Sequence, residues 1–197
     1  LPSIVADFLQ QLTMAREEKR PYVYFVATYG TSPGQTGRFA AEILQKRGWQ
    51  LTASYSIKFP DTWTPMFDLS DPVQVARLND EAEPQIDAVI THLKNEDAGN
   101  YMTRQVPLLA ARAFYRLEYD RIRQTKHFSV KDDCIGCGLC AKGCPAGALE
   151  MRAGRPAWTK DACVMCLSCL HHCPKFAIQY GKRTEKHGQY RHPLYKK

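Results

Sequence analysis

The residues best suited to chemistry are eight cysteines, all of which lie between residues 134 and 173 of this 197-residue chain. They form two runs with the same spacing, Cys-x2-Cys-x2-Cys-x3-Cys followed by proline, which begin at Cys134 and Cys163. This spacing is typical of thiolates that bind iron–sulfur clusters of the 4Fe-4S type. The repeat therefore predicts two such clusters in the C-terminal part of the chain.

The spacing also predicts that the two runs exchange their fourth ligands. The first three cysteines of each run should wrap one cluster, whereas the fourth opens a short helix and should reach across to the other cluster. The predicted ligands of cluster I are Cys134, Cys137, Cys140 and Cys173. The predicted ligands of cluster II are Cys163, Cys166, Cys169 and Cys144.

Zinc and disulfides are the alternatives for these thiols. A zinc ribbon needs only two Cys-x2-Cys pairs, so zinc leaves the third cysteine of each run and the prolines at 145 and 174 unexplained. Disulfides are typical of secreted proteins, and residues 1–12 lack the features of a secretory signal. We therefore expect cluster-binding thiolates in a cytoplasmic protein, with His171 and His172 tuning or capping a cluster rather than binding iron.

The positive charge is concentrated at the cysteine-bearing end. Residues 1–125 carry 14 Lys and Arg against 15 Asp and Glu, whereas residues 126–197 carry 13 against 5. Clusters with thiolate ligands add negative charge, so the loaded cysteine region should not be basic, and the C-terminal tail 182–197 remains the strongly positive element. We expect no nucleic-acid surface, and a tail that either docks on an acidic partner or is simply solvated.

The elements before the cysteines predict an α/β arrangement. The pattern indicates a helix over 1–11, a strand over 21–28 that is buried on both faces of a parallel sheet, a helix over 38–47 and a second strand over 51–59. Two strands do not make a stable sheet. We expect the rest to come from residues upstream of this sequence, from the following helices or from another chain, and the missing initiator Met favours truncation.

Residues 70–125 predict a helical connector. The periodicity indicates a helical region from Ser70 that is broken or kinked at Pro84, a turn over 98–100, and a helix over 106–123 whose arginines face solvent. No apolar run approaches the roughly 18 residues of a membrane span. The expected domains are therefore 1–69, the connector 70–125, a two-cluster domain over 126–181, and the tail 182–197.

The whole pattern resembles the two-module flavodoxin-ferredoxin proteins of anaerobes, in which a flavodoxin-like half is fused to a bacterial two-cluster ferredoxin. Besides the cysteine runs, residues 1–9 are similar to the helix after the third flavodoxin strand, and residues 22–28 and 51–59 to the fourth and fifth strands. Gly-Lys-Arg-Thr and Arg-His-Pro in the tail resemble the ending of that family. The resemblance implies an α/β flavodoxin-like domain followed by an α+β ferredoxin domain.

The resemblance also implies a loop that flanks a flavin ring after the first strand. The residues it assigns to this loop are Thr28, Tyr29, Gly30, Thr31, Ser32, Gly34 and Gly37. The family's Ser/Thr-rich loop for the flavin phosphate has no counterpart here. Because that phosphate needs several converging donors, we expect this chain, as given, to bind FMN weakly or not at all.

The expected function is electron transfer by two 4Fe-4S clusters, which relay single electrons between a redox protein partner and a flavin or flavoprotein. Two alternatives remain open. One is an FMN-dependent oxidoreductase that its own ferredoxin module feeds with electrons. The other is an electron-transfer subunit of a larger redox complex. A flavin site with room for a substrate would favour the first alternative, and a persistent partner would favour the second.

Overall fold

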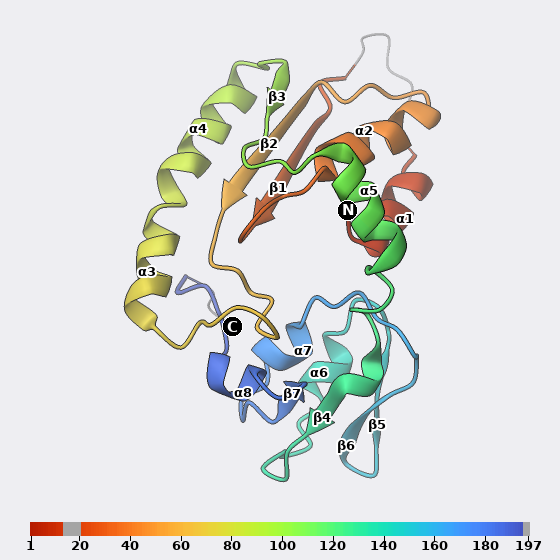
Figure 1. Cartoon of the computed structure of the whole chain (residues 1–197), viewed down its shortest axis with the longest axis vertical. Coiled ribbons are helices and arrows are strands. Elements are labelled where there is room, and N and C mark those ends of the chain that lie inside the picture. Colours follow the sequence, from red (N-terminus) through yellow and green to blue (C-terminus); the bar gives the residue numbers. More distant parts are fainter. Residues whose placement is uncertain (14–20, 195–197) are drawn as a thin grey trace. The chain divides into compact units, whose positions relative to one another are not determined.

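The computed structural model describes residues 1–13 and 21–194, which form two compact units. The N-terminal unit comprises Leu1–Pro60 and Arg77–Phe114, and the C-terminal unit comprises Asp61–Ala76 and Tyr115–Lys197. Figure 1 shows the elements of each unit coloured along the chain. Helix α3 (Pro72–Asp80) contains one of the boundaries between the units.

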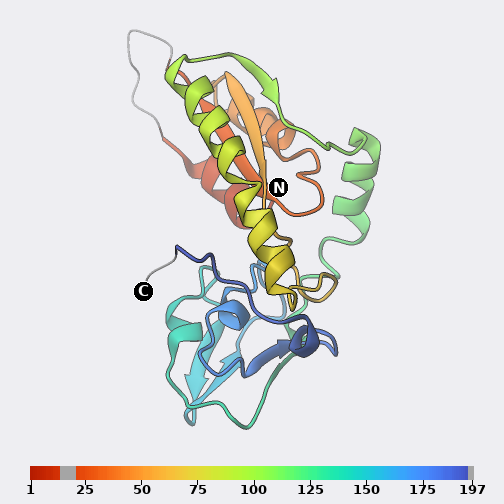
Figure 2. The ribbon, with the colours of Figure 1, turned by 90° about the vertical axis from the view of Figure 1, so that its left-hand side faces the viewer.

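The N-terminal unit is built on a parallel sheet of three strands in the order β1-β2-β3. These are β1 (Tyr24–Tyr29), β2 (Ala53–Lys58) and β3 (Gly99–Tyr101). The central strand β2 is buried along almost its whole length, as expected of a parallel strand with neighbours and cover on both sides. Figure 2 shows this sheet beside the long helix α4.

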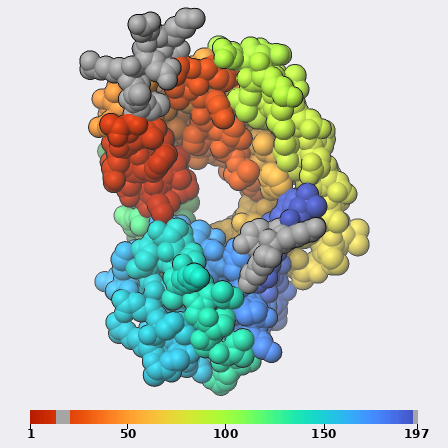
Figure 3. All heavy atoms as spheres, turned by 180° about the vertical axis from the view of Figure 1, so that it is seen from behind, coloured from red at the N-terminus to blue at the C-terminus, as the bar shows by residue number. Residues whose placement is uncertain are grey.

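Helices cover both faces of this sheet. On one face, α4 (Glu83–Lys94) packs against Ala53, Tyr55 and Ile57 of β2. On the other face, α1 (Ser3–Gln11) and α2 (Thr36–Lys46) form an apolar cluster with Phe25 and Leu51. Helix α1, red in Figure 3, lies on the surface of this unit. The arrangement confirms the expected strand–helix–strand order.

Three expectations for this part of the chain differ from the structure. Strand β1 is not buried on both faces, because Tyr24 and Val26 lie on the side where α4 covers only β2, and they remain 51% and 36% exposed. Residues 98–100 are not simply a turn, because β3 pairs there with β2. The pairing supplies one of the missing strands from within the chain. Helix α5 (Leu108–Leu117) is shorter than the expected 106–123.

The C-terminal unit combines two small antiparallel sheets with short helices. One sheet pairs β4 (Phe128–Val130) with β7 (Ile178–Tyr180), and the other is the hairpin of β5 (Leu149–Arg152) and β6 (Arg155–Trp158). The helical elements are the 3-10 turn η1 (Thr125–His127), α6 (Leu139–Lys142), α7 (Ser168–His171) and α8 (Thr184–His187). The unit is therefore of the α+β type.

The core of the C-terminal unit forms around Leu167, Leu170, Ile178 and Tyr180. Phe128 and Trp158 stack against this core from β4 and β6, with ring centroids 4.6 Å apart. Two cysteines, one from each run, pack against the same core, namely Cys140 and Cys169. Within residues 1–13 and 21–194, no helix has the length and apolar character needed to cross a membrane.

Candidate metal centre

The eight cysteines are free thiols that line two pockets in the C-terminal unit. One pocket has about 340 Å³ of space among its lining atoms, part of it open to solvent, and its thiols are Cys134, Cys137, Cys140 and Cys173. The other has about 330 Å³ of such space, and its thiols are Cys144, Cys163, Cys166 and Cys169. We call them pocket I and pocket II. Each pocket thus groups three thiols of one run with the fourth thiol of the other run.

The two runs follow the same backbone path. Three positions in or just after the first run adopt positive φ, and the positions 29 residues later do so as well, although those carry side chains. The pairs are Gly136 (φ 65°) and Met165 (50°), Gly138 (72°) and Leu167 (53°), and Gly147 (52°) and Phe176 (49°). Left-handed backbone costs a side-chain-bearing residue of order 1 kcal/mol or more. The second run therefore adopts this path against its local preference.

Glycine is needed at one of these positions for a second reason. A Cβ on Gly136 would lie 2.7 Å from the carbonyl oxygen of Gly154, in the turn between β5 and β6. Backbone atoms cannot yield as a flexible side chain can, so the loop between Cys134 and Cys137 packs directly on the hairpin. The hairpin thereby supports one wall of pocket I.

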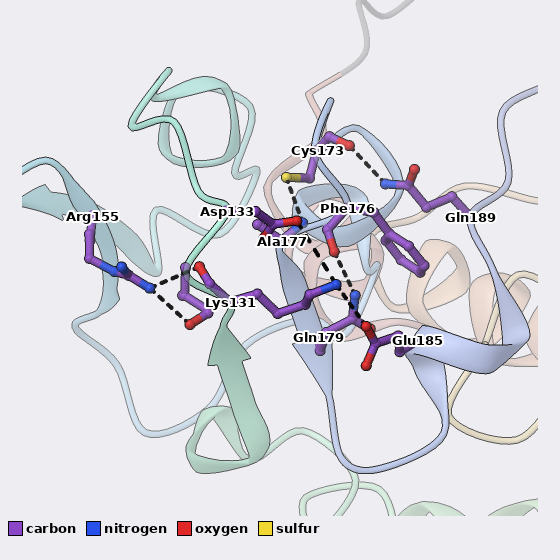
Figure 4. Close-up of polar contacts among 10 residues, drawn as sticks. Lys131, Asp133, Arg155, Cys173, Phe176, Ala177, Gln179, Glu185 and Gln189 are labelled. Atoms are coloured by element: carbon purple, nitrogen blue, oxygen red, sulfur yellow. Dashed lines mark hydrogen bonds and ion pairs between the residues drawn. The ribbon is translucent and has the colours of Figure 1, made fainter.

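Backbone N–H groups point at three of the thiols. Ala148 N–H donates to Cys144 Sγ at 3.3 Å, and Ala177 N–H, at the matching place in the second run, donates to Cys173 Sγ at 3.2 Å. Met165 N–H donates to Cys163 Sγ at 3.4 Å. Figure 4 shows the contact between Ala177 and Cys173. Such donors favour the thiolate and stabilise negative charge that is added at a site.

Burial and neighbouring thiols raise the pKa of four cysteines. Burial is the larger cause for Cys140, Cys163, Cys166 and Cys169. Proximity to Cys173 adds to the rise for Cys140, whereas proximity to Cys144 adds to it for Cys163 and Cys166. The thiols within each pocket therefore repel one another as thiolates. A cation that binds between them would remove this penalty.

The donor set fits a cluster. Among the residues that the structure describes, no three Cys, His, Asp or Glu side chains converge closely enough to hold a single metal ion. The thiols of each pocket instead lie around its wall, and in pocket I apolar side chains such as Ile135, Leu139 and Met151 line the wall with them. Four thiolates around a pocket match the four-cysteine ligation of a 4Fe-4S cluster.

Two side chains that the cysteine spacing does not reveal hold the main chain of the runs. Arg123 donates through Nε to the carbonyl of Cys163 at 2.7 Å, and Cys163 N–H donates to the carbonyl of Arg123 at 3.0 Å. Gln189 donates through Nε2 to the carbonyl of Cys173 at 2.9 Å, as Figure 4 shows. No sequence signal identified either contact, because a side chain that meets a main-chain carbonyl follows no fixed spacing.

The two histidines of the second run hydrogen-bond to protein groups. His171 is 4% exposed, burial lowers its pKa, and its Nε2 contacts the carbonyl of Thr62 at 2.9 Å. His172 Nδ1 lies 3.0 Å from the carbonyl of Ser168, one turn earlier. Both rings thus have partners other than a thiol. The expectation that they tune or cap a cluster stays a prediction.

The residues assigned to a flavin-ring loop lie at the carboxyl end of β1 and the start of α2. Two of them form hydrogen bonds with residues 103 and 104 of the same unit. Tyr29 Oη lies 3.0 Å from Thr103 Oγ1, and Ser32 Oγ donates to the carbonyl of Arg104 at 2.7 Å. Gly37 lies against Met102 and Ser54 so closely that a Cβ would clash. The remaining residues of this set, Thr28, Gly30, Thr31 and Gly34, belong to the same end of β1 and the same loop.

Comparison with known proteins agrees with the C-terminal site. Residues 126–186, just under a third of the chain, match the family model of the 4Fe-4S dicluster domain. Searches of curated proteins and of solved structures found no match for the chain. The family match, together with eight cysteines within the matched region, supports an iron–sulfur electron-transfer role. Residues 126–186 of this chain form a ferredoxin-like iron–sulfur module.

Proposed function

We propose that this protein carries two 4Fe-4S clusters and passes single electrons between redox partners. Cluster I would be held by Cys134, Cys137, Cys140 and Cys173, and cluster II by Cys163, Cys166, Cys169 and Cys144. The observation that carries the proposal is the lining of the two pockets, in which the fourth thiol of each run joins the first three of the other. When bound, such clusters accept and release one electron at a time.

The chain's own residues support this role by shielding the pockets and by offering donors to sulfur. Leu149, Trp158 and Leu167 line pocket II, and Met151, Pro156 and Ile178 line pocket I. Apolar walls keep water from the ligands, and the N–H groups of Ala148 and Ala177 would stabilise the additional negative charge of a reduced state. These features tune a redox site without contributing acid–base groups.

Partner proteins could reach the pockets at their edges. Cys137 in pocket I and Cys166 in pocket II are the most solvent-exposed of the eight cysteine residues. The exposed side chains of Lys182, Arg183 and Lys186 add positive charge to the same unit. We infer that the redox partners present an acidic surface, because opposite charges speed and orient encounters between proteins.

The N-terminal unit supports a flavodoxin-like assignment. Its parallel strands have helices on both faces, and the loop after β1 lies at the carboxyl end of the sheet, where ligands bind in open α/β folds. We propose that this unit is a partial flavodoxin-like domain and that the protein exchanges electrons with a flavin or flavoprotein. The proposed cluster domain is 126–181, with 182–197 as its basic extension.

Anaerobic purification followed by metal and sulfide analysis tests the proposal. We expect about eight iron and eight sulfide per chain, together with electron paramagnetic resonance signals of two interacting centres on reduction. Zinc without inorganic sulfide would overturn it. A chain with about four iron would keep the iron–sulfur role but refute the second cluster. The discriminating control is the apoprotein reconstituted with iron and sulfide or, in parallel, with zinc alone.

A further inference from the structure

The C-terminal segment 187–191 is tied to the second cysteine run. Gln189 Nε2 donates to two carbonyls, that of Leu170 at 2.6 Å and that of Cys173 at 2.9 Å. Leu170 lies in α7, and Cys173 follows that helix by two residues. The last carbonyls of a helix have no partner within it. The carbonyl of Leu170 also accepts Cys173 N–H at 3.3 Å, so Gln189 adds a side-chain donor at the end of α7 and holds the main chain of Cys173 at the same time.

Further contacts fix the segment on both sides of Gln189. Tyr190 N–H donates to His171 Nδ1 at 3.1 Å, and Arg191 Nε donates to the carbonyl of His171 at 3.0 Å. Because Nδ1 accepts, the proton of the neutral ring lies on Nε2, which donates to the carbonyl of Thr62. His187 Nδ1 contacts the carbonyl of Thr64 at 2.7 Å. Segment 187–191, helix α7 and residues 62–64 of this unit are thus linked.

The first run has no matching clamp among the described residues. The carbonyls equivalent to those of Leu170 and Cys173 are the carbonyls of Ala141 and Cys144, which accept backbone N–H groups from residues 143, 144 and 147. In the second run, the carbonyl of Cys173 accepts Phe176 N–H, just as the carbonyl of Cys144 accepts Gly147 N–H. The carbonyl of Cys173 also accepts the side-chain amide of Gln189. The clamp consequently acts on one repeat of a nearly symmetric pair.

We propose that Gln189 is a positioning residue for Cys173, so that segment 187–191 selectively secures the cluster of pocket I. This inference rests on the proposed function, because it needs a cluster in each pocket. Cys173 is the ligand that pocket I takes from the other run, and it follows a helix of only four residues. A short helix holds its end weakly by itself, so the extra donor restricts a ligand that local structure holds only weakly.

The test is the rate at which each cluster is lost when the purified anaerobic protein is mixed with an iron chelator. Gln189→Met keeps the side-chain length but removes both donated hydrogen bonds. Loss of the pocket I cluster should become on the order of ten-fold faster, whereas loss of the pocket II cluster should keep its wild-type rate. Visible absorption follows total loss, and hyperfine-shifted proton resonances of the cysteine β-methylenes report each cluster separately.

Two further variants control the experiment. Gln74→Met makes the same substitution at an exposed position of α3 and should leave both rates unchanged. Arg123→Met removes the donor to the carbonyl of Cys163, a pocket II ligand, and should reverse the selectivity. Unchanged rates in Gln189→Met, or equal acceleration at both clusters, would overturn the clamp. A wild-type protein with clearly fewer than about eight iron would instead refute the proposed pair of clusters, and the clamp with it.

Discussion

Replacing Cys144 with alanine should remove the cluster in pocket II and spare the cluster in pocket I. In sequence, Cys144 belongs to the first run, whose other three cysteines line pocket I. In the structure, Cys144 lines pocket II with Cys163, Cys166 and Cys169. Burial raises the pKa of Cys163, and the neighbouring thiols, Cys144 among them, raise it further. The Cys144 side chain thus lies close enough to raise the pKa of thiols in the second run.

The expected magnitude follows from the number of ligands. Three thiols remain in pocket II after Cys144→Ala, whereas all four remain in pocket I, so iron should fall from about eight to about four per chain, with sulfide in parallel. The variant also loses the hydrogen bond from Ala148 N–H to sulfur, which is worth about 1 kcal/mol. That cost is small beside the stability of a folded domain. A loss of half the iron would therefore report ligation rather than unfolding.

The assay compares four alanine variants by iron content and by the electron paramagnetic resonance spectrum of the surviving cluster. The spectrum of Cys144→Ala should match that of Cys163→Ala, and the spectrum of Cys173→Ala should match that of Cys134→Ala. Cys173 is the matched control because its sulfur accepts the equivalent bond, from Ala177, at 3.2 Å. If the Cys144 and Cys134 variants share a spectrum instead, each run holds its own fourth ligand and the crossed assignment is wrong.

Three further outcomes are expected. Gly136→Ala should destabilise the protein in thermal unfolding by about 1–3 kcal/mol, and clearly more than Gly154→Ala does. Both glycines have positive φ, but only a Cβ at residue 136 would meet backbone atoms. Equal destabilisation by the two substitutions would refute the close packing of residue 136 on the hairpin. Tyr55→Phe should cost about 1 kcal/mol by removing a buried hydroxyl bonded to Tyr22 and to the carbonyl of Asp97. Since burial raises the pKa of Tyr55, stability should fall above about pH 10 in wild type, and less steeply in that variant. Titration with FMN should show weak or no binding, and stoichiometric binding would refute our interpretation of the missing phosphate loop.

The cysteine region was predictable because its chemistry depends on spacing. The positions of Cys134 to Cys144 and their repetition indicate the cluster type, and the family match over 126–186 supports that type. The contacts of Gln189 and Arg123 were not predictable, since each joins a side chain to a carbonyl far away in sequence. The charge pattern of the tail predicts only a basic extension. Its polar residues instead bind the main chain of α7, at least as far as Arg191.

The N-terminal unit shows a different limit. The apolar run of β1 predicts burial on both faces, but periodicity cannot tell which neighbours a strand will have, and Tyr24 lies beyond the reach of α4. Strand β3 has only three residues and begins with Gly99, so its composition resembles a turn. Pairing with β2 decides its structure, and long-range pairing of this kind leaves no local signal.

The crossed lining of the pockets has a consequence for the order in which the protein is made. Pocket I needs Cys173 and pocket II needs Cys169, so neither set of thiols is complete until nearly the whole repeat has left the ribosome. The first run cannot close a four-thiol site on its own, however early it emerges. Both sites become complete within a few residues of each other, which would favour loading the two proposed clusters together, after synthesis of this region, over loading them one by one.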